Sequence, residues 1–228
     1  IGTVLSFETK EPTVTTSTTI NIPMDSLTGW NEEDSSAFSL NTGNEQVDWD
    51  TQRDGTNNAI TYNLGQILPT AWTLQYELTF DNNNSGGGNW VYVGIVDNDG
   101  SVTHASAQDG IATFLMNEQN TSAKQRHGIP TGDDAVACNG NFGLSSCQSY
   151  NSNVQYSTGT KYYITLERVS STESISTVRT GSHTGTVHDT FTKSDTAEAT
   201  GLQYFRVSDL DDNSSGGDFD GVIENVVV

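Results

Sequence analysis

The clearest pattern in the chain is a strict alternation of apolar and polar residues over positions 72–80. The apolar members are Trp72, Leu74, Tyr76, Leu78 and Phe80. A period of two predicts a β-strand with one face in a hydrophobic core and the other in solvent. A second apolar run, residues 90–96, follows an Asn/Gly-rich segment. We predict that the two strands form a hairpin.

Other short apolar or β-branched runs predict further strands. They occupy residues 59–64, 110–116, 161–169, 175–179, 202–207 and 222–228. Segments rich in Gly, Asn and Asp separate them, and no helical stripe is longer than two turns. This organisation predicts an all-β fold, a jelly-roll β-sandwich of antiparallel strands.

The first part of the chain is interpreted separately from the sandwich. We predict an N-terminal extension over residues 1–23 and a β-sandwich domain over residues 24–228. Residues 13–22 are rich in Thr, Val and Ile, so they are β-prone. They could form an edge strand of their own sandwich, or they could donate a strand to a neighbouring subunit.

Two short motifs carry a resemblance to a known family. Residues 220–228, with the sequence DGVIENVVV, resemble the closing strand of the laminin-G-like and concanavalin A-like lectin/glucanase superfamily. Residues 162–168, YYITLER, resemble its central strand. The resemblance covers residues 24–228 and implies a jelly-roll β-sandwich. That superfamily includes carbohydrate binders, adhesion modules, glycanases and structural surface proteins, so the fold does not fix the function.

The chain is strongly acidic, and this limits its partners. It has 29 acidic and 9 basic residues, a formal net charge of -20. Such a charge repels nucleic acid and anionic lipid, and no apolar run is long enough for membrane insertion. The chain begins at Ile1 rather than Met, which we interpret as processing of an extracellular or cell-surface protein.

An acidic loop over residues 209–221 precedes the last apolar run. Oxygen-rich side chains in a flexible loop are what Ca²⁺ prefers, although a solvated Asp/Asn/Gly turn has the same composition. Asp97 and Asp99 form a second candidate, and loops at the same end of a jelly roll could converge on one ion. The predicted ligands in the main loop are Asp209, Asp211, Asn213, Asp218 and Asp220.

Two covalent features are predicted. Cys138 and Cys147 flank a short polar loop, which favours a local disulfide over a metal site. Sequons for N-linked glycans occur at Asn83, Asn120 and Asn213. Asn213 cannot easily carry a glycan and bind calcium with the same amide, so one of these two predictions must fail.

No catalytic set is recognisable. In the nearest match to a glycanase signature, EQVDWD at residues 45–50, the spacing puts Glu45 on the opposite face from Asp48 and Asp50. The histidines lack the alternate spacing of a zinc pair on a strand; they are His104, His127, His183 and His188. Trp49 is the best candidate for an exposed platform that stacks on a sugar.

From these observations we predict a secreted, non-enzymatic structural subunit of an extracellular filament or cell-surface assembly. Exchange of β-strands would join the subunits into a polymer, and calcium would stabilise them. The alternative is a calcium-dependent carbohydrate-binding or adhesion module, whose partners would be glycans.

Overall fold

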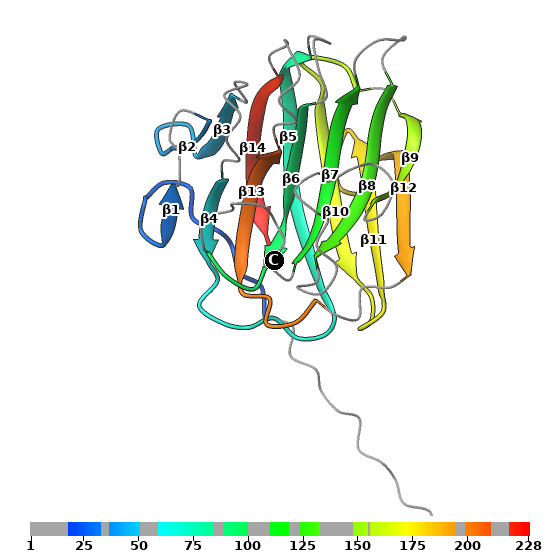
Figure 1. The fold of residues 1–228 in the computed structure, drawn as a ribbon. Helices are drawn as coiled ribbons and strands as arrows, with labels where there is room; N and C mark the ends of the chain where they lie inside the picture. Colours follow the sequence, from blue (N-terminus) through cyan, green and yellow to red (C-terminus); the bar gives the residue numbers. More distant parts are fainter. Residues whose placement is uncertain are drawn as a thin grey trace, which may run out of the picture.

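The computed structural model describes residues 18–32, 37–50, 59–83, 89–99, 110–118, 124–132, 148–154, 156–194, 199–210 and 219–228. Two antiparallel seven-stranded sheets pack face to face (Figure 1). Sheet A has the strand order β12 (Thr186–Ser194), β11 (Glu173–Thr180), β10 (Lys161–Arg168), β5 (Trp72–Asn83), β14 (Phe219–Val227), β3 (Gln46–Asp50) and β2 (Phe38–Asn41). Sheet B has the order β1 (Trp30–Glu32), β4 (Ala59–Asn63), β13 (Tyr204–Leu210), β6 (Asn89–Val96), β7 (Gly110–Glu118), β8 (Lys124–Gly132) and β9 (Gln148–Val154).

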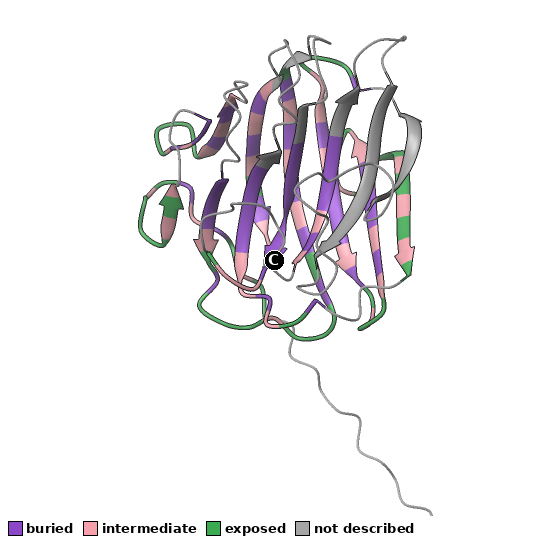
Figure 2. Ribbon diagram, in the orientation of Figure 1, coloured by how far each residue is buried: buried purple, intermediate pink, exposed green. Residues whose placement is uncertain are grey.

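The core lies between the sheets and follows from the alternation in the sequence. On β5, Leu74, Tyr76 and Leu78 are fully buried, whereas the residues between them face outward. Strand β10 shows the same alternation, with Ile164 and Leu166 in the core. Figure 2 shows these buried positions along the central strands of both sheets. The predicted all-β jelly-roll class is therefore correct.

The predicted hairpin between residues 72–80 and 90–96 is wrong. Strand β5 pairs with β10 and β14 in sheet A, whereas β6 pairs with β7 and β13 in sheet B. The connection between β5 and β6 therefore crosses from one sheet to the other. Both runs bury an apolar face in this arrangement too, so their local patterns do not distinguish it from a hairpin.

The other six predicted segments all contain strands, but several strands were not predicted. The missed strands are either short, as β1 and β2 are, or polar, as β8, β9 and β12 are. Strand β12 has the sequence TVHDTFTKS and is exposed along much of its length because it is at an edge of sheet A. Edge strands need no apolar alternation, so the pattern on which the prediction depended is weak there.

The N-terminal segment belongs in part to the sandwich of its own chain. Ile20 N donates to Val228 O at 2.7 Å, Val228 N donates to Ile20 O at 2.9 Å, and Ile22 N donates to Val226 O at 3.0 Å. Ile22 and Met24 are buried in the core. Residues 20–22 thus pair with the end of β14, beyond the residues of β14 that pair with β3, and the predicted boundary at residue 23 cuts through this segment. Residues 1–17 lie outside the described part.

A bulge in β14 sets which of its side chains enter the core. Ile223 and Val226 are both buried, although an unbroken strand would point residues three apart to opposite faces. The register shifts between Glu224 and Val227, and Asn225 has a φ of 51°. The extra residue lets Glu224 stay on the outer face while Val226 turns inward.

The close packing of Trp49 on Gly221 gives a test of the fold. A Cβ at Gly221 would lie 2.2 Å from Thr79 O and 2.7 Å from Trp49 Cζ2. We expect Gly221→Ala to lower the free energy of unfolding by about 2 kcal/mol, because a backbone atom cannot move aside. Gly43→Ala is the matched control, since its Cβ would meet only Asn41 Oδ1 at 3.7 Å. Urea midpoints measure both, and equal midpoints would contradict the packing.

Candidate functional site

The outer face of sheet A carries a row of side chains that crosses every strand and is polar except at its end on β12, where it has Val187. Successive residues in this row are direct cross-strand partners, from β2 at one edge to β12 at the other. We call it the central row; its members are Asn41, Gln46, Glu224, Glu77, Tyr163, Arg179 and Val187. Their neighbours along each strand point into the core, so the alternation that builds the core also builds this face.

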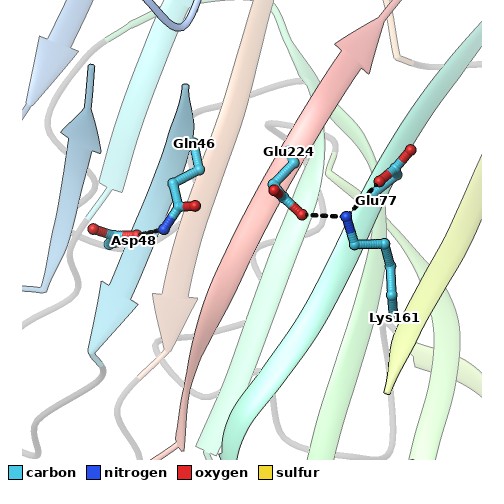
Figure 3. Close-up of polar contacts among 5 residues, drawn as sticks. All are labelled: Gln46, Asp48, Glu77, Lys161 and Glu224. Atoms are coloured by element: carbon cyan, nitrogen blue, oxygen red, sulfur yellow. Dashed lines mark hydrogen bonds and ion pairs between the residues drawn. The ribbon is translucent and has the colours of Figure 1, made fainter. Parts of the chain in front are cut away.

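A lysine joins two carboxylates at the centre of the row (Figure 3). Lys161 Nζ lies 2.8 Å from Glu77 Oε2 and 2.7 Å from Glu224 Oε2. Glu77 and Glu224 are directly opposite one another on β5 and β14. Like charges in that position destabilise a sheet, and the ammonium group between them offsets the repulsion.

The pKa values follow from this arrangement. Burial alone would raise the pKa of Glu77, but hydrogen bonds from Lys161 and Asn225 and the charges of Lys161 and His183 hold it below its ordinary 4.5. Hydrogen bonds to Glu224 and Glu77 raise the pKa of Lys161 above its ordinary range. Glu77 and Lys161 are therefore ionised at neutral pH, and the charge of Lys161 is compensated within the face.

A second polar cluster lies beside the first, on β2 and β3. Asn41 Nδ2 donates to Asp48 Oδ2 at 2.8 Å, and Gln46 Nε2 donates to Asp48 Oδ1. The Gln46 contact appears in Figure 3, next to Glu224 on β14. Each oxygen of the Asp48 carboxylate thus accepts an amide proton. The two amides are held in fixed orientations. Asn41 Oδ1 accepts from Asn44 N at 3.2 Å, and Gln46 keeps its carbonyl oxygen as an acceptor.

A histidine from the turn between β11 and β12 lies over the other half of the face. The rings of His183 and Tyr163 are 5.4 Å apart and nearly perpendicular, and His183 Nδ1 lies 3.5 Å from Thr165 Oγ1. Burial, more than any other effect, lowers the pKa of His183; the charge of Glu77 raises it and that of Arg179 lowers it. The imidazole is therefore neutral at pH 7, with one donor and one acceptor nitrogen. The spacing of the histidines in the sequence did not predict that His183 lies on this face.

The chemistry that this face offers is hydrogen bonding. It presents amides, carboxylates, a phenol, a guanidinium and an imidazole. A glycosidase needs one carboxylic acid with a raised pKa. Glu77 has a lowered pKa and is bonded to Lys161. Glu77 is therefore ionised at neutral pH and does not meet this requirement for an acid catalyst.

Trp49 is not an exposed platform, which corrects our prediction. Its side chain is only 2% exposed and packs in the core, with its ring 5.9 Å from that of Phe80. Residues at positions 46, 48 and 50 face outward, so residue 49 must face inward. The flanking aspartates suggested exposure, but they belong to the opposite face of the strand.

The two predicted calcium loops lie at opposite ends of the molecule. Asp97 follows β6 and its backbone carbonyl accepts a hydrogen bond from Gln203, just before β13. Asp209 is near the other end of β13, opposite Val91. The length of β13 separates them by about 20 Å, so they cannot share an ion. Asp97 is half-buried and Asp99 exposed.

Little of the main acidic loop is within the described residues. Asp209 and Asp220 begin and end it, on β13 of sheet B and β14 of sheet A, and Asp220 is directly opposite Asp50. Asp211, Asn213 and Asp218 lie outside the described residues. Among the residues that are described, no group of three or more His, Cys, Asp or Glu side chains could hold a metal ion.

The predicted covalent sites are also largely outside the described part. Cys138, Cys147, Asn120 and Asn213 are not within it. Asn83 is, and its backbone ends β5 opposite Phe219. None of the described residues forms a helix with the length and hydropathy of a membrane span.

Comparison with solved structures identifies the fold. A legume lectin-like domain from Entamoeba histolytica has a TM-score of 0.58 at 13% identity and covers 89% of each chain. The Ca²⁺- and Man3GlcNAc-bound exoplasmic/lumenal domain of VIP36 has a TM-score of 0.60 at 11% identity, covering 91% of this chain and 87% of the other. The fold is a concanavalin A-like jelly roll.

The concanavalin A-like fold also occurs in an enzyme among these neighbours. The alginate lyase Aly36B has a TM-score of 0.54 at 12% identity and covers 92% of this chain and 95% of its own. No protein-family model matches the sequence, and no curated protein matches it. At such low identities the likeness concerns the fold alone, so the function must be argued from this chain's own residues.

The half-buried cluster of Lys161, Glu77 and Glu224 can be tested through its pH dependence. We expect Lys161→Met to lower the free energy of unfolding by about 1 kcal/mol at pH 7, because Glu77 and Glu224 then face each other without a cation. The pKa of Glu77 is lower in the folded state than its ordinary value of 4.5. Its contribution to the free energy of unfolding is therefore fully present above pH 4.5 and is lost as the pH falls below that value.

The difference between wild type and Lys161→Met should therefore shrink in acid, as Glu77 is protonated. Urea midpoints at pH 7 and pH 3 measure it. Lys193→Met, on the exposed edge strand β12, controls for loss of a lysine. An equal destabilisation at both pH values would show that the aliphatic stem of Lys161, and not its charge, is what matters.

Proposed function

We propose that this protein is a non-enzymatic carbohydrate-binding module that acts outside the cell or at its surface. One observation carries the proposal: a continuous face of oriented amides, carboxylates and hydroxyls across sheet A, with Tyr163 in it. Such groups match the hydroxyls of a sugar, which both donate and accept. Its occurrence on a concanavalin A-like fold, among neighbours that include lectin domains, adds support.

Several features favour binding over catalysis. A lyase acting on a uronate polymer must neutralise the carboxylate of its substrate, and Lys161 already contacts two carboxylates of its own chain. Glu77 is held ionised, which does not suit an acid catalyst. The likeness to an alginate lyase therefore does not bring lyase activity with it.

Calcium dependence is the finer part of the proposal and depends on the end of the sandwich where β14 begins. Asp220 and Asp50 are opposed there in neighbouring strands, and the acidic loop from residue 209 leads into the same place. A bound Ca²⁺ would reduce repulsion between these carboxylates and tie β13 to β14. Calcium would then act on stability rather than on chemistry.

A glycan array probed with and without chelator tests this function. We expect selective binding to a small set of glycans, and a thermal midpoint that rises with millimolar CaCl₂ and falls with EGTA. Asp220→Asn should reduce the calcium-dependent shift, whereas Asp25→Asn, on an exposed turn, should not. If no glycan is bound under any condition, the module does not recognise carbohydrate.

A second candidate function is self-assembly by strand exchange. Three hydrogen bonds and two buried side chains hold residues 20–24 against the end of β14. Because these few contacts are all made by one short segment, the same segment of another copy could take its place. The result would be a chain of subunits and thus a filament, the arrangement that the β-prone N-terminal residues predict.

Paired cysteines distinguish the two arrangements. Asn21 and Val227 are opposed between hydrogen-bonded pairs, which is where Cα atoms are about 4.5 Å apart and a disulfide can form. If subunits exchange this segment, the double variant Asn21→Cys/Val227→Cys will form disulfide-linked oligomers at high concentration on a non-reducing gel. Asn21→Cys alone is the control. A monomeric disulfide at every concentration would exclude strand exchange by this segment.

A further inference from the structure

We infer that the ligand of the outer face of sheet A is an uncharged, linear glycan that lies across the strands along the central row. This inference deepens the proposed carbohydrate-binding function and depends on it. It adds three properties that the proposal does not contain: where the ligand lies, its charge class, and the number of sugar units that the face can contact.

The first argument is the length and direction of the row. Its seven residues are in register on seven neighbouring strands, from Asn41 on β2 to Val187 on β12. Strands in a sheet are about 4.8 Å apart, so the row spans about 29 Å. One strand spacing is close to the length of one pyranose unit. A linear glycan perpendicular to the strands would therefore place about one sugar over each interval between neighbouring strands, roughly six in all.

The second argument is that polar residues also flank the row on both sides. Along one side, the residues that pair across successive strands are Asp48 on β3, Val222 on β14, Thr79 on β5 and Lys161 on β10. All of them except Val222 are polar. Along the other side, Gln75, Thr165 and Thr177 are successive cross-strand partners. Thr165 and Thr177 are buried, so a chain that follows the central row would meet the amide of Gln75 on this side and the polar groups of Thr79, Asp48 and Lys161 on the other.

The third argument is charge. Within these rows the acidic groups are Asp48, Glu77 and Glu224, and the basic groups are Lys161 and Arg179. Lys161 contacts Glu77 and Glu224, and Asp48 accepts from two amides. Lys161 is therefore already engaged, which leaves Arg179 as the further cation of these rows beside three carboxylates, and the net charge of -20 repels polyanions at longer range. An uncharged polymer is the glycan that suits it.

Titration calorimetry with oligosaccharides of increasing length tests the inference. The panel contains uncharged oligomers of glucose, mannose and N-acetylglucosamine with two to eight units, and oligouronates of the same lengths. We expect affinity for one uncharged series to rise at least tenfold between two and about six units and then level off, since the row spans about 29 Å. The oligouronates should not bind.

Variants then locate the ligand. Gln46 and Arg179 lie on opposite sides of Glu77, each two strands away from it. We expect Gln46→Ala and Arg179→Ala each to weaken binding of the hexamer at least tenfold and to affect binding of the dimer less. Gln66→Ala is the matched control, on the exposed connection between β4 and β5. Circular dichroism and urea midpoints show whether each variant is folded, so a loss of affinity cannot be confused with unfolding.

The outcomes separate this inference from the proposed function. If uncharged glycans bind but the two row variants leave affinity unchanged, the module binds carbohydrate elsewhere and the inference is overturned. Preferential binding of oligouronates, or affinity independent of length, would overturn it as well. If no oligosaccharide binds, the proposed function fails together with the inference.

Discussion

The placement of β14 between β3 and β5 is the interaction on which the rest of this structure depends. Strand β14 is the last in the chain, yet it pairs with β5 on one side and with β3 on the other. Its Gly221 leaves the space that the indole of Trp49 fills, and its final residues pair with Ile20. The N-terminal, central and C-terminal parts of the chain are thus joined in one sheet.

The same strand also brings two acidic side chains together on the outer face of sheet A. It brings Glu224 directly opposite Glu77, an arrangement that only a nearby cation makes favourable. Lys161 on β10 supplies that cation and in doing so connects three neighbouring strands. Lys161 and Arg179 offset two of the three carboxylates in these rows, Asp48, Glu77 and Glu224, which leaves a surface of oriented hydrogen-bonding groups with a small negative charge. This is the physical basis for preferring an uncharged glycan as the ligand.

The two proposed activities use separate parts of the molecule and are compatible. The central row lies on the outer face of sheet A, whereas strand exchange involves the N-terminal segment beside the end of β14. The proposed calcium ion would bind at the opposite end of β14, near Asp220. A repeating assembly of such subunits would present many copies of one weak glycan-binding face, and multivalency would then raise the overall avidity.

The sequence by itself determined the fold class, because alternation is a local property: each of Leu74, Tyr76 and Leu78 must be buried whichever strand lies beside it. It also placed Asp48 and Asp50 on one face of a strand, which they share in β3, although Trp49 between them was predicted to be exposed and is buried. Only the tertiary structure decided that β5 and β6 belong to different sheets, and that Glu77, Glu224 and Lys161 meet. His183 reaches the face from a turn with no recognisable pattern. Such contacts depend on the register between strands that are far apart in sequence, and register is fixed by the packing of the whole sandwich rather than by any short segment.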